Sequence, residues 1–382
     1  MTSRHRPDWT GRLARLRADS TSRGLHAFVV STPGNLLYLC GFQGSAGVLV
    51  EAGGRAFLVV DGRYVTGAQR DAADGRIGPV EVVGVVRRYD ESLVEFLVQR
   101  GVTEVGFEAE QVSVARLRRW QCAAPALNWS PTEGMVEAQR AVKDAAEIAV
   151  LRRAGRELAY IASRLGDWVA EGRTEREVAR AIDNAIERAG FSEPAFPTIV
   201  ASGPNSALPH ARPTDRQLQR GDLVVLDFGG VLDGYCGDLT RMAGVGEVKA
   251  EARGLFDAVR AAQVAALAAV RAEALVYEVD AAARRVLTTH GFGDAILHAT
   301  GHGLGLEVHE APRLGRRSES IGGRPGEPSE REIDRLSAGM VCTIEPGAYV
   351  EGVGGVRLED DVVVTDEGCE VLTEAPRDLL LV

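Results

Sequence analysis

The stretch VVLDFGGVLDGYCGDLTR, residues 224–241, decides how we interpret the fold of this chain. The apolar run 224–226 predicts a short β-strand. Asp233-Gly234 is a two-residue turn signal, because both residues tolerate the positive φ angles that tight hairpins require. The sequence therefore predicts an antiparallel hairpin centred on this turn.

The predicted hairpin places two aspartates on one face. With the turn at Asp233-Gly234, Gly229 lies opposite Asp238, and Asp227 points to the same side because side chains alternate along a strand. The two carboxylates then lie about 7–8 Å apart on a diagonal, over a glycine that contributes no bulk. Such a pair suits the bridging of cations, although a polar hairpin exposed to water is the alternative.

Length and charge limit the possible classes of protein. The chain has 382 residues with 45% hydrophobic content, which is enough for two hydrophobic cores. Asp and Glu number 54 against 44 Lys and Arg, and the resulting net charge of −10 argues against binding to a phosphate backbone. We therefore expect two domains and no nucleic-acid partner.

Cysteine usage and hydropathy indicate the compartment. The five cysteines are widely spaced and form no C-x-x-C pair, so the sequence suggests neither a disulfide framework nor a thiolate zinc site. The first twenty residues are charged throughout, and no apolar run reaches 18 residues. We expect a cytoplasmic protein that is neither exported nor inserted in a membrane.

The first third of the chain has the pattern of an α/β unit. Trp9, Leu13 and Leu16 recur at helical spacing, and 27–30, 46–52 and 55–61 read as strands between glycine-rich turns, one of them at Pro33-Gly34-Asn35. Pro125, Pro131 and Gly134 then loosen the chain. We place the boundary near residue 135, which gives domains 1–135 and 136–382.

The second domain alternates helices with glycine-rich segments. An apolar stripe from Ile148 to Trp168 predicts one helix, and Thr174 with Glu177 forms a capping box for the next. Alanine-rich runs at 249–273 and 279–290 predict two more helices, and the glycines at 352–355 predict a second hairpin. The segment 313–330 reads as a polar surface loop.

Residues able to carry out chemistry concentrate in this second domain. Four of the seven histidines lie in two glycine- or proline-rich segments, and we single them out as candidates: His210, His298, His302 and His309. Glu345 ends an apolar run before Pro346, which removes a competing donor. Arg357 and Glu359 are two residues apart, so on a strand both would point to one face, where the arginine could orient an anion. A solvated turn is the alternative for the acids at 359–361.

A mixed donor set emerges from these segments. Hard carboxylates with one imidazole suit Mn(II), Fe(II), Co(II) or Zn(II) in a two-metal arrangement, whereas structural zinc favours sulfur or several histidines. Two such ions can share a hydroxide and polarise a carbonyl, which is the chemistry of amide or ester hydrolysis. The members of this set are Asp227, Asp238, His302, Glu345 and Glu359.

The order of the motifs resembles the pita-bread metallopeptidases, the family of methionine aminopeptidase, aminopeptidase P, prolidase and creatinase. The motifs are PH at 209–210, DFGG to GDLTR at 227–241, TGHGLGLEVHE at 300–310, IEPG at 344–347 and RLED at 357–360. Residues 26–65 also resemble the creatinase-type N-terminal domain. The resemblance implies an α+β chain with a C-terminal pita-bread catalytic domain and a smaller N-terminal α/β domain.

The resemblance also implies roles for the candidate residues. Asp227, Asp238, His302, Glu345 and Glu359 would be the ligands of two divalent ions, with Asp238 and Glu359 bridging. His210, His298 and His309 would bind substrate and transfer protons, Arg357 would be the active-site arginine, and Glu345 would hold the proton of the attacking water. Mn(II) is the first expectation for the metal, with Co(II), Zn(II) and Fe(II) as alternatives.

Within this family, the N-terminal domain disfavours methionine aminopeptidase, and the complete ligand set disfavours creatinase. We expect an Xaa-Pro aminopeptidase or Xaa-Pro dipeptidase that uses a metal-bridged hydroxide, acts on small peptides and forms a homodimer. Two alternatives stay open: an amidohydrolase of a small ectoine- or creatine-like amide, and a non-catalytic peptide-binding module. The loop 313–330 is longer than the usual connection, and could be a lid, a dimer contact or a plain insertion.

Overall fold

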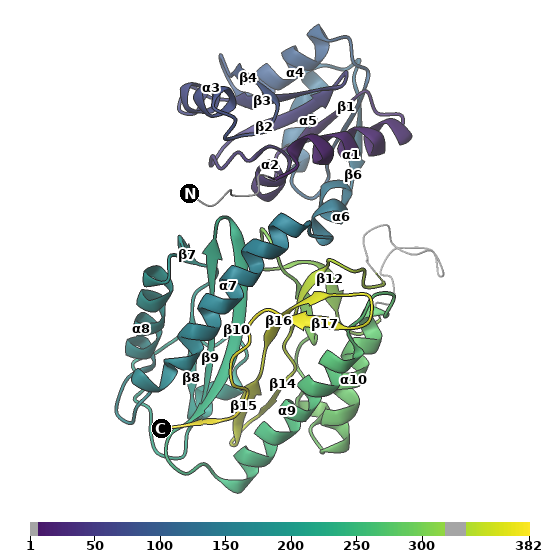
Figure 1. Ribbon diagram of the computed structural model, residues 1–382. Coiled ribbons are helices and arrows are strands. Elements are labelled where there is room, and N and C mark those ends of the chain that lie inside the picture. The colour runs from purple at the N-terminus through teal and green to yellow at the C-terminus, as the bar shows by residue number, and fades with distance from the viewer. Residues whose placement is uncertain (1–6, 318–333) are drawn as a thin grey trace. The chain divides into compact units, whose positions relative to one another are not determined.

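The computed structural model describes residues 7–317 and 334–382 (Figure 1). The chain forms two compact units, Met1–Arg140 and Ala141–Val382. Most of the loop expected at 313–330 falls outside the described residues. Mixed helices and strands in both units confirm the predicted α+β class.

The first unit is built on a six-stranded sheet in the order β4-β3-β2-β1-β5-β6. Strands β1, β2 and β3 are antiparallel neighbours, while β4, β5 and β6 join in parallel pairs. The strands are β1 Ala27–Val30, β2 Val48–Ala52, β3 Arg55–Val60, β4 Val80–Gly84, β5 Glu104–Glu108 and β6 Asn128–Thr132.

One prediction for the first unit is wrong. Residues 33–35 do not form a turn but begin helix α2, in which Pro33 occupies the first turn, where its missing N–H costs no helical hydrogen bond. The helix at Trp9 is confirmed. The helices are α1 Trp9–Ser22, α2 Pro33–Cys40, α3 Val65–Ala73, α4 Tyr89–Gln99, α5 Val114–Ala123 and α6 Met135–Ala141.

The second unit is organised around the predicted hairpin. Strands β9 (Leu223–Leu232) and β10 (Tyr235–Gly244) pair over ten residues, and Asp238 faces Gly229 as expected. Asp233 and Gly234 both have positive φ, 50° and 88°. The sheet continues through β7 Glu193–Pro194, β8 Ile199–Ser202 and β18 Leu380–Leu381.

A second sheet in this unit carries the other site segments. Its order is β12-β11-β13-β16-β17, and a separate hairpin pairs β14 with β15, which confirms the hairpin expected around 352–355. The strands are β11 Gly301–Gly303, β12 Glu310–Leu314, β13 Val341–Ile344, β14 Gly347–Val350, β15 Gly354–Arg357, β16 Asp360–Val364 and β17 Cys369–Val371.

Helices cover both groups of strands. Helix α7 packs on β9 and β10, α8 on β8, α9 on β13, β14 and β15, and α10 on α9 and β12. The predicted capping box at Thr174 and Glu177 begins α8. The helices are α7 Ala145–Ser163, α8 Glu175–Arg188, α9 Ala250–Ala269 and α10 Val276–Thr289, with short 3₁₀ turns η1 Leu165–Asp167, η2 Gly203–Ala207 and η3 Gly293–Ala295.

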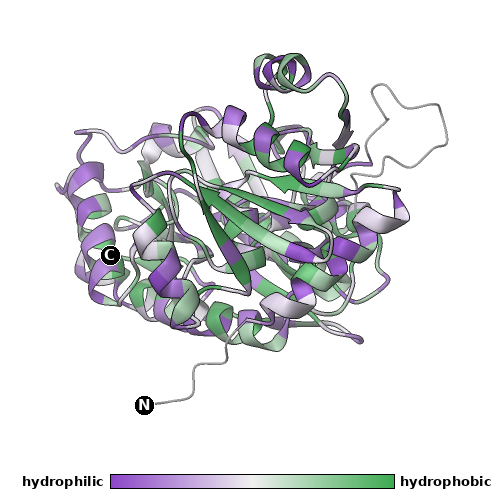
Figure 2. Ribbon diagram, turned by 90° about the horizontal axis from the view of Figure 1, so that it is seen from above, coloured by the Kyte–Doolittle hydropathy of each residue, from purple (hydrophilic) through white to green (hydrophobic). Residues whose placement is uncertain are grey.

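The hydropathy of the ribbon follows this layering. In Figure 2 several strands are green over most of their length, whereas the helices alternate between green and purple. The alternation is expected of helices that bury one face and expose the other. Within residues 7–317 and 334–382, none of the helices has the length and apolar content needed to cross a membrane.

Phe228 should be a main support of the hairpin, because its side chain is fully buried and its backbone pairs with that of Leu239. We expect Phe228→Ala to lower the free energy of unfolding by about 3–5 kcal/mol, since the cavity adds to the lost burial. Urea denaturation measures this. Val264→Ala, at a position 56% exposed on α9, should change the value by less than about 0.5 kcal/mol; equal effects would contradict the assignment.

Candidate metal centre

The hairpin aspartates are inside the protein. Asp227 is 8% exposed and Asp238 is 5% exposed, so the alternative of a solvated polar hairpin is wrong. The space above Gly229, the glycine between them, is not open, however. A Cβ at Gly229 would lie 2.7 Å from the ring of Phe196 and 3.3 Å from Ala195. These two side chains therefore cover the hairpin face beside the carboxylates.

Glu345 and Glu359 lie next to the ends of two strands, β13 and β16. Glu345 follows β13, and its N–H donates to Thr300 O at 2.7 Å. Arg357 ends β15 and Glu359 lies before β16, so these two residues do not share one strand as we expected. They meet at Thr240 instead, whose hydroxyl donates to Glu359 Oε2 at 2.7 Å and accepts from Arg357 Nε at 3.3 Å.

His302 presents one ring nitrogen to the acids. On strand β11, its Nδ1 is 3.1 Å from Gly303 O, an arrangement in which Nδ1–H donates and Nε2 keeps its lone pair. Nε2 is 3.5 Å from Glu345 Oε1. One ligand atom each from Asp238, His302 and Glu359 lie within 4.8 Å of one another. Neutral imidazole with a carbonyl behind it is the usual form of a metal-binding histidine.

The carboxylates repel one another in a poorly solvated space. Burial, followed by the charges of Glu359 and Asp227, raises the pKa of Asp238 well above its usual value. Burial and the charges of Glu345 and Asp227 do the same to the pKa of Glu359, and burial raises the pKa of Glu345 to about 8. Burial lowers the pKa of His302 to about 4, so the ring is neutral at pH 7.

These residues fit divalent cations. Among the described residues, Asp227 Oδ1, Asp238 Oδ1 and Glu359 Oε1 are buried and accept no hydrogen bond. An unpaired buried carboxylate oxygen is costly, and a cation removes the cost while it also favours the charged form. The donor set of carboxylates and one imidazole matches the metals expected from the sequence.

A short chain of hydrogen bonds joins Arg357 to His298 through Tyr349. The sequence analysis did not predict Tyr349 as a site residue. Arg357 Nη1 donates to Tyr349 Oη at 2.7 Å, and Tyr349 Oη is 2.8 Å from His298 Nε2. His298 Nδ1 is 2.8 Å from Ala299 O. Burial lowers the pKa of His298 to about 4 and raises that of Tyr349 to about 12. Tyr349 therefore donates to a neutral His298.

Arg357 also pairs with Asp227 through Nη2 and Oδ2. Close approach of the network to the backbone requires a glycine, because a Cβ at Gly347 would lie 2.8 Å from both His298 Nε2 and Tyr349 Oη. The spacing E-P-G-x-Y alone could have drawn attention to Tyr349, since it places the ring two residues beyond this glycine.

The two remaining predicted histidines lie at the edge of the site. His309 is exposed, and its ring centroid is 4.4 Å from that of His302. His210 is also exposed and lies near enough for its charge to contribute to the lowered pKa of His298. The carbonyl of the preceding residue, Pro209, accepts from Arg357 Nη1 at 3.3 Å.

Buried residues behind the ligands hold their backbone, and the sequence did not point to them. Asp361 is 2% exposed, and its Oδ2 accepts from the N–H of Asp238 at 2.9 Å. Arg241 donates to Glu359 O at 2.5 Å, to Asp360 Oδ1 at 2.8 Å and to the carbonyls of residues 373, 375 and 376. The alternative of a solvated turn at 359–361 is therefore wrong, because these acids are buried and bonded.

Glu175 anchors the loop that carries His210. This carboxylate is fully buried in the first turn of α8. It accepts from Ser202 N and Oγ at 2.8 and 2.7 Å, and from Thr214 N and Oγ1 at 2.9 and 2.6 Å. Asn205 Nδ2 adds a bond at 3.0 Å. Both ends of the segment 202–214 are thus fixed to one side chain.

The fold is that of a known family. The chain belongs to metallopeptidase family M24, which matches residues 149–366, and the creatinase/prolidase N-terminal domain matches residues 12–142. Members of the family depend on metal ions and have dinuclear sites. The predicted family and the predicted pita-bread catalytic domain with its creatinase-type N-terminal domain are confirmed.

Several relatives match this chain over nearly its whole length. An uncharacterized peptidase of Bacillus subtilis is 32% identical over 97% of this chain and 99% of its own length. The structure of an Xaa-Pro dipeptidase from Bacillus anthracis has a TM-score of 0.88 at 32% identity and covers 98% of this chain and 100% of that one. The X-Pro aminopeptidase from Thermotoga maritima has a TM-score of 0.85 at 31% identity, with coverage of 97% and 99%.

The raised pKa of Glu345 makes the stability of the metal-free protein depend on pH. Folding raises this pKa from 4.5 to about 8, so the contribution of Glu345 to stability is complete at low pH and is lost progressively as the pH rises from 4.5 to about 8. Urea denaturation without metal measures the free energy of unfolding of the wild type and of Glu345→Gln. The wild-type value minus the variant value should fall between pH 5 and 8, by up to about 1.4 kcal/mol per pH unit. Parallel pH curves for the two proteins would contradict this.

Glu175 should act on turnover through the position of the His210 loop. We expect Glu175→Gln to lower kcat for a peptide substrate by about tenfold or more at unchanged metal content, because its amide leaves N–H donors of Ser202 or Thr214 unpaired. Glu177→Gln is the matched control, since Glu177 lies in the same helical turn and its carboxylate accepts from the N–H of the cap residue Thr174, not from the His210 loop. Steady-state kinetics with metal analysis would test this; equal kcat in both variants would refute it.

Proposed function

We propose that the chain is a dinuclear metallo-exopeptidase that hydrolyses the Xaa-Pro amide bond, either at the N-terminus of peptides or in Xaa-Pro dipeptides. One observation carries the proposal: buried carboxylate oxygens without hydrogen-bond partners gather beside a neutral imidazole in a chain of family M24. The relatives named as Xaa-Pro dipeptidase and X-Pro aminopeptidase support the choice of bond.

In this proposal Asp227, Asp238, His302, Glu345 and Glu359 hold two divalent ions, with Asp238 and Glu359 shared between them. When bound, the ions supply Lewis-acid activation of a water molecule and of the peptide carbonyl. Mn(II) is our first choice because the set is rich in oxygen, and Co(II), Zn(II) and Fe(II) suit the same donors.

The remaining residues bind, orient and move protons. Glu345, which lies beside His302, holds the proton of the attacking water. Tyr349 and Arg357 orient His298, whose ring nitrogens are both engaged. His210 and His309, both exposed beside this network, contact the substrate and pass a proton to the leaving amine.

The proposal includes the compartment, the oligomeric state and the size of the substrates. The thiols of all five cysteines are free, which suits a reducing compartment, and we propose the cytoplasm. We also propose a homodimer with small Xaa-Pro peptides as its substrates.

Activity against matched peptides tests the function. The protein reconstituted with Mn(II) should hydrolyse Xaa-Pro dipeptides or Xaa-Pro-Yaa tripeptides, and the ratio of kcat/KM on the two substrates separates dipeptidase from aminopeptidase. Asp238→Asn should lower kcat by more than about 100-fold, because it removes a shared ligand while the backbone stays in place.

Asp233→Asn, in the turn of the same hairpin, is the control and should keep activity, since Asn also tolerates a positive φ. Preference for a small cyclic or guanidino amide over both peptides would favour an amidohydrolase. Failure to bind about two ions per chain, with no turnover, would favour a non-catalytic binding module.

A further inference from the structure

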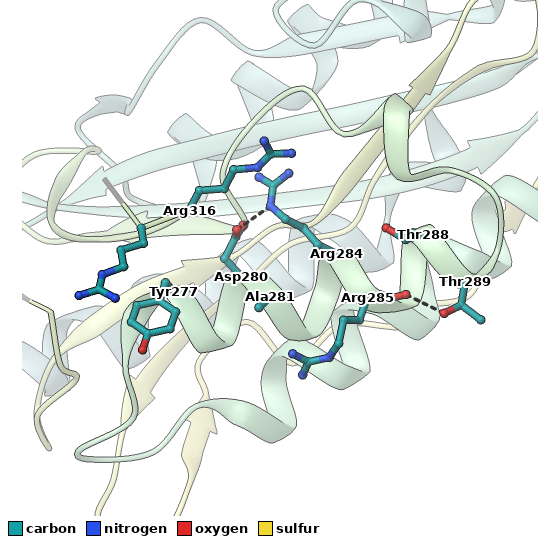
Figure 3. A pocket seen from close by; sticks show the side chains of 9 residues that line it. Tyr277, Asp280, Ala281, Arg284, Arg285, Thr288, Thr289 and Arg316 are labelled. Carbon is teal, nitrogen blue, oxygen red and sulfur yellow. Dashed lines mark hydrogen bonds and ion pairs between the residues drawn. The ribbon is translucent and has the colours of Figure 1, made fainter. Parts of the chain in front are cut away.

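An open pocket of about 540 Å³ lies along helix α10, and none of its lining residues is a candidate metal ligand (Figure 3). One wall comes from the helix and the other from the chain after β12. The residues that matter to its chemistry are Tyr277, Arg284, Arg285, Thr288, Arg316 and Arg317. Figure 3 shows Arg316 extending over α10 toward the end of Arg284.

The pocket collects positive charge that has no counterpart in the part of the chain that the structure describes. Arg284 forms an ion pair with Asp280, whereas Arg285, Arg316 and Arg317 have no carboxylate partner among the described residues. On the neighbouring helix α9, by contrast, Arg253 pairs with Asp257 and Arg260 pairs with Asp378. Three guanidinium groups around one hollow thus lack a carboxylate partner within residues 7–317 and 334–382, although the chain carries a net charge of −10.

Arg284 is held in a fixed position at the base of the pocket. Its Nε donates to Asp280 Oδ2 at 2.5 Å and its Nη2 donates to His298 O at 2.8 Å, while its side chain is 17% exposed. Asp280 is itself fixed, because its Oδ1 accepts from Thr300 N and Oγ1. Arg284 Nη1 has no hydrogen-bond partner in the described residues, so it is a pre-oriented donor.

We propose that this pocket is a second ligand site, for small multiply charged oxyanions of the class of inorganic phosphate and phosphate monoesters. Guanidinium groups bind such oxygens in a bidentate manner, and the hydroxyl of Thr288 adds a neutral donor. Several arginines around one ligand match a dianion with three or more acceptor oxygens better than a single carboxylate. This site goes beyond the proposed peptidase activity and does not depend on it.

Calorimetric titration of the metal-loaded, full-length protein with inorganic phosphate, phenyl phosphate and acetate tests the site, without any peptide. We expect phosphate and phenyl phosphate to bind more tightly than acetate. The double variant R285Q/R316Q should weaken phosphate binding by about tenfold or more, because it removes two charge-assisted donors. Comparison of phosphate with phenyl phosphate separates a free anion from a phosphate carried on a larger molecule.

R253Q/R260Q is the matched control, since it removes the same charge from the neighbouring helix α9, and it should leave the affinity unchanged. Phosphate bound at the metal ions would be unaffected by R285Q/R316Q, so equal affinity of this variant and the wild type would overturn the proposal. An equal loss in R253Q/R260Q would also overturn it, because the effect would then reflect total charge. Peptidase activity in all these variants is a separate result.

Discussion

The structure of the second unit depends on the close burial of several acids. Asp227, Asp238, Glu359 and Asp361 are at most 8% exposed, and Glu345 lies beside them within 3.5 Å of His302. Like charges in a space with little water are stable only when protons, hydrogen bonds or cations compensate them. Much of the surrounding architecture has this function: Arg357 pairs with Asp227, and Thr240 donates to Glu359.

The sequence was most informative where a local rule determines geometry. Asp233-Gly234 determined the turn, and the turn determined which residue faces Asp238, because a two-residue loop leaves one register. Capping at Thr174 and the alanine-rich helices followed from equally local rules. The order of the acidic and histidine motifs then predicted the family, although each motif alone was ambiguous.

The sequence was less informative where distant segments meet. Pro33 fits both a turn and the first turn of a helix, and only packing in the first unit selects the helix. Glu175 and Asp361 lie far along the chain from Thr214 and Asp238, and Tyr349 lies far from His298, so no spacing predicts these contacts. We expected Arg357 and Glu359 to share one strand. Strand β15 ends at Arg357 and β16 begins at Asp360, so the two side chains meet through Thr240 instead.

The contacts of Arg241 have a consequence for how the protein is made. Its guanidinium binds the carbonyl of Glu359 together with the carbonyls of residues 373, 375 and 376, so a segment synthesised late secures a residue of the acidic cluster. A nascent chain that has not yet added these residues lacks part of that support. The backbone of Glu359 therefore gains its full set of contacts only after the carbonyls of residues 373, 375 and 376 have packed against Arg241.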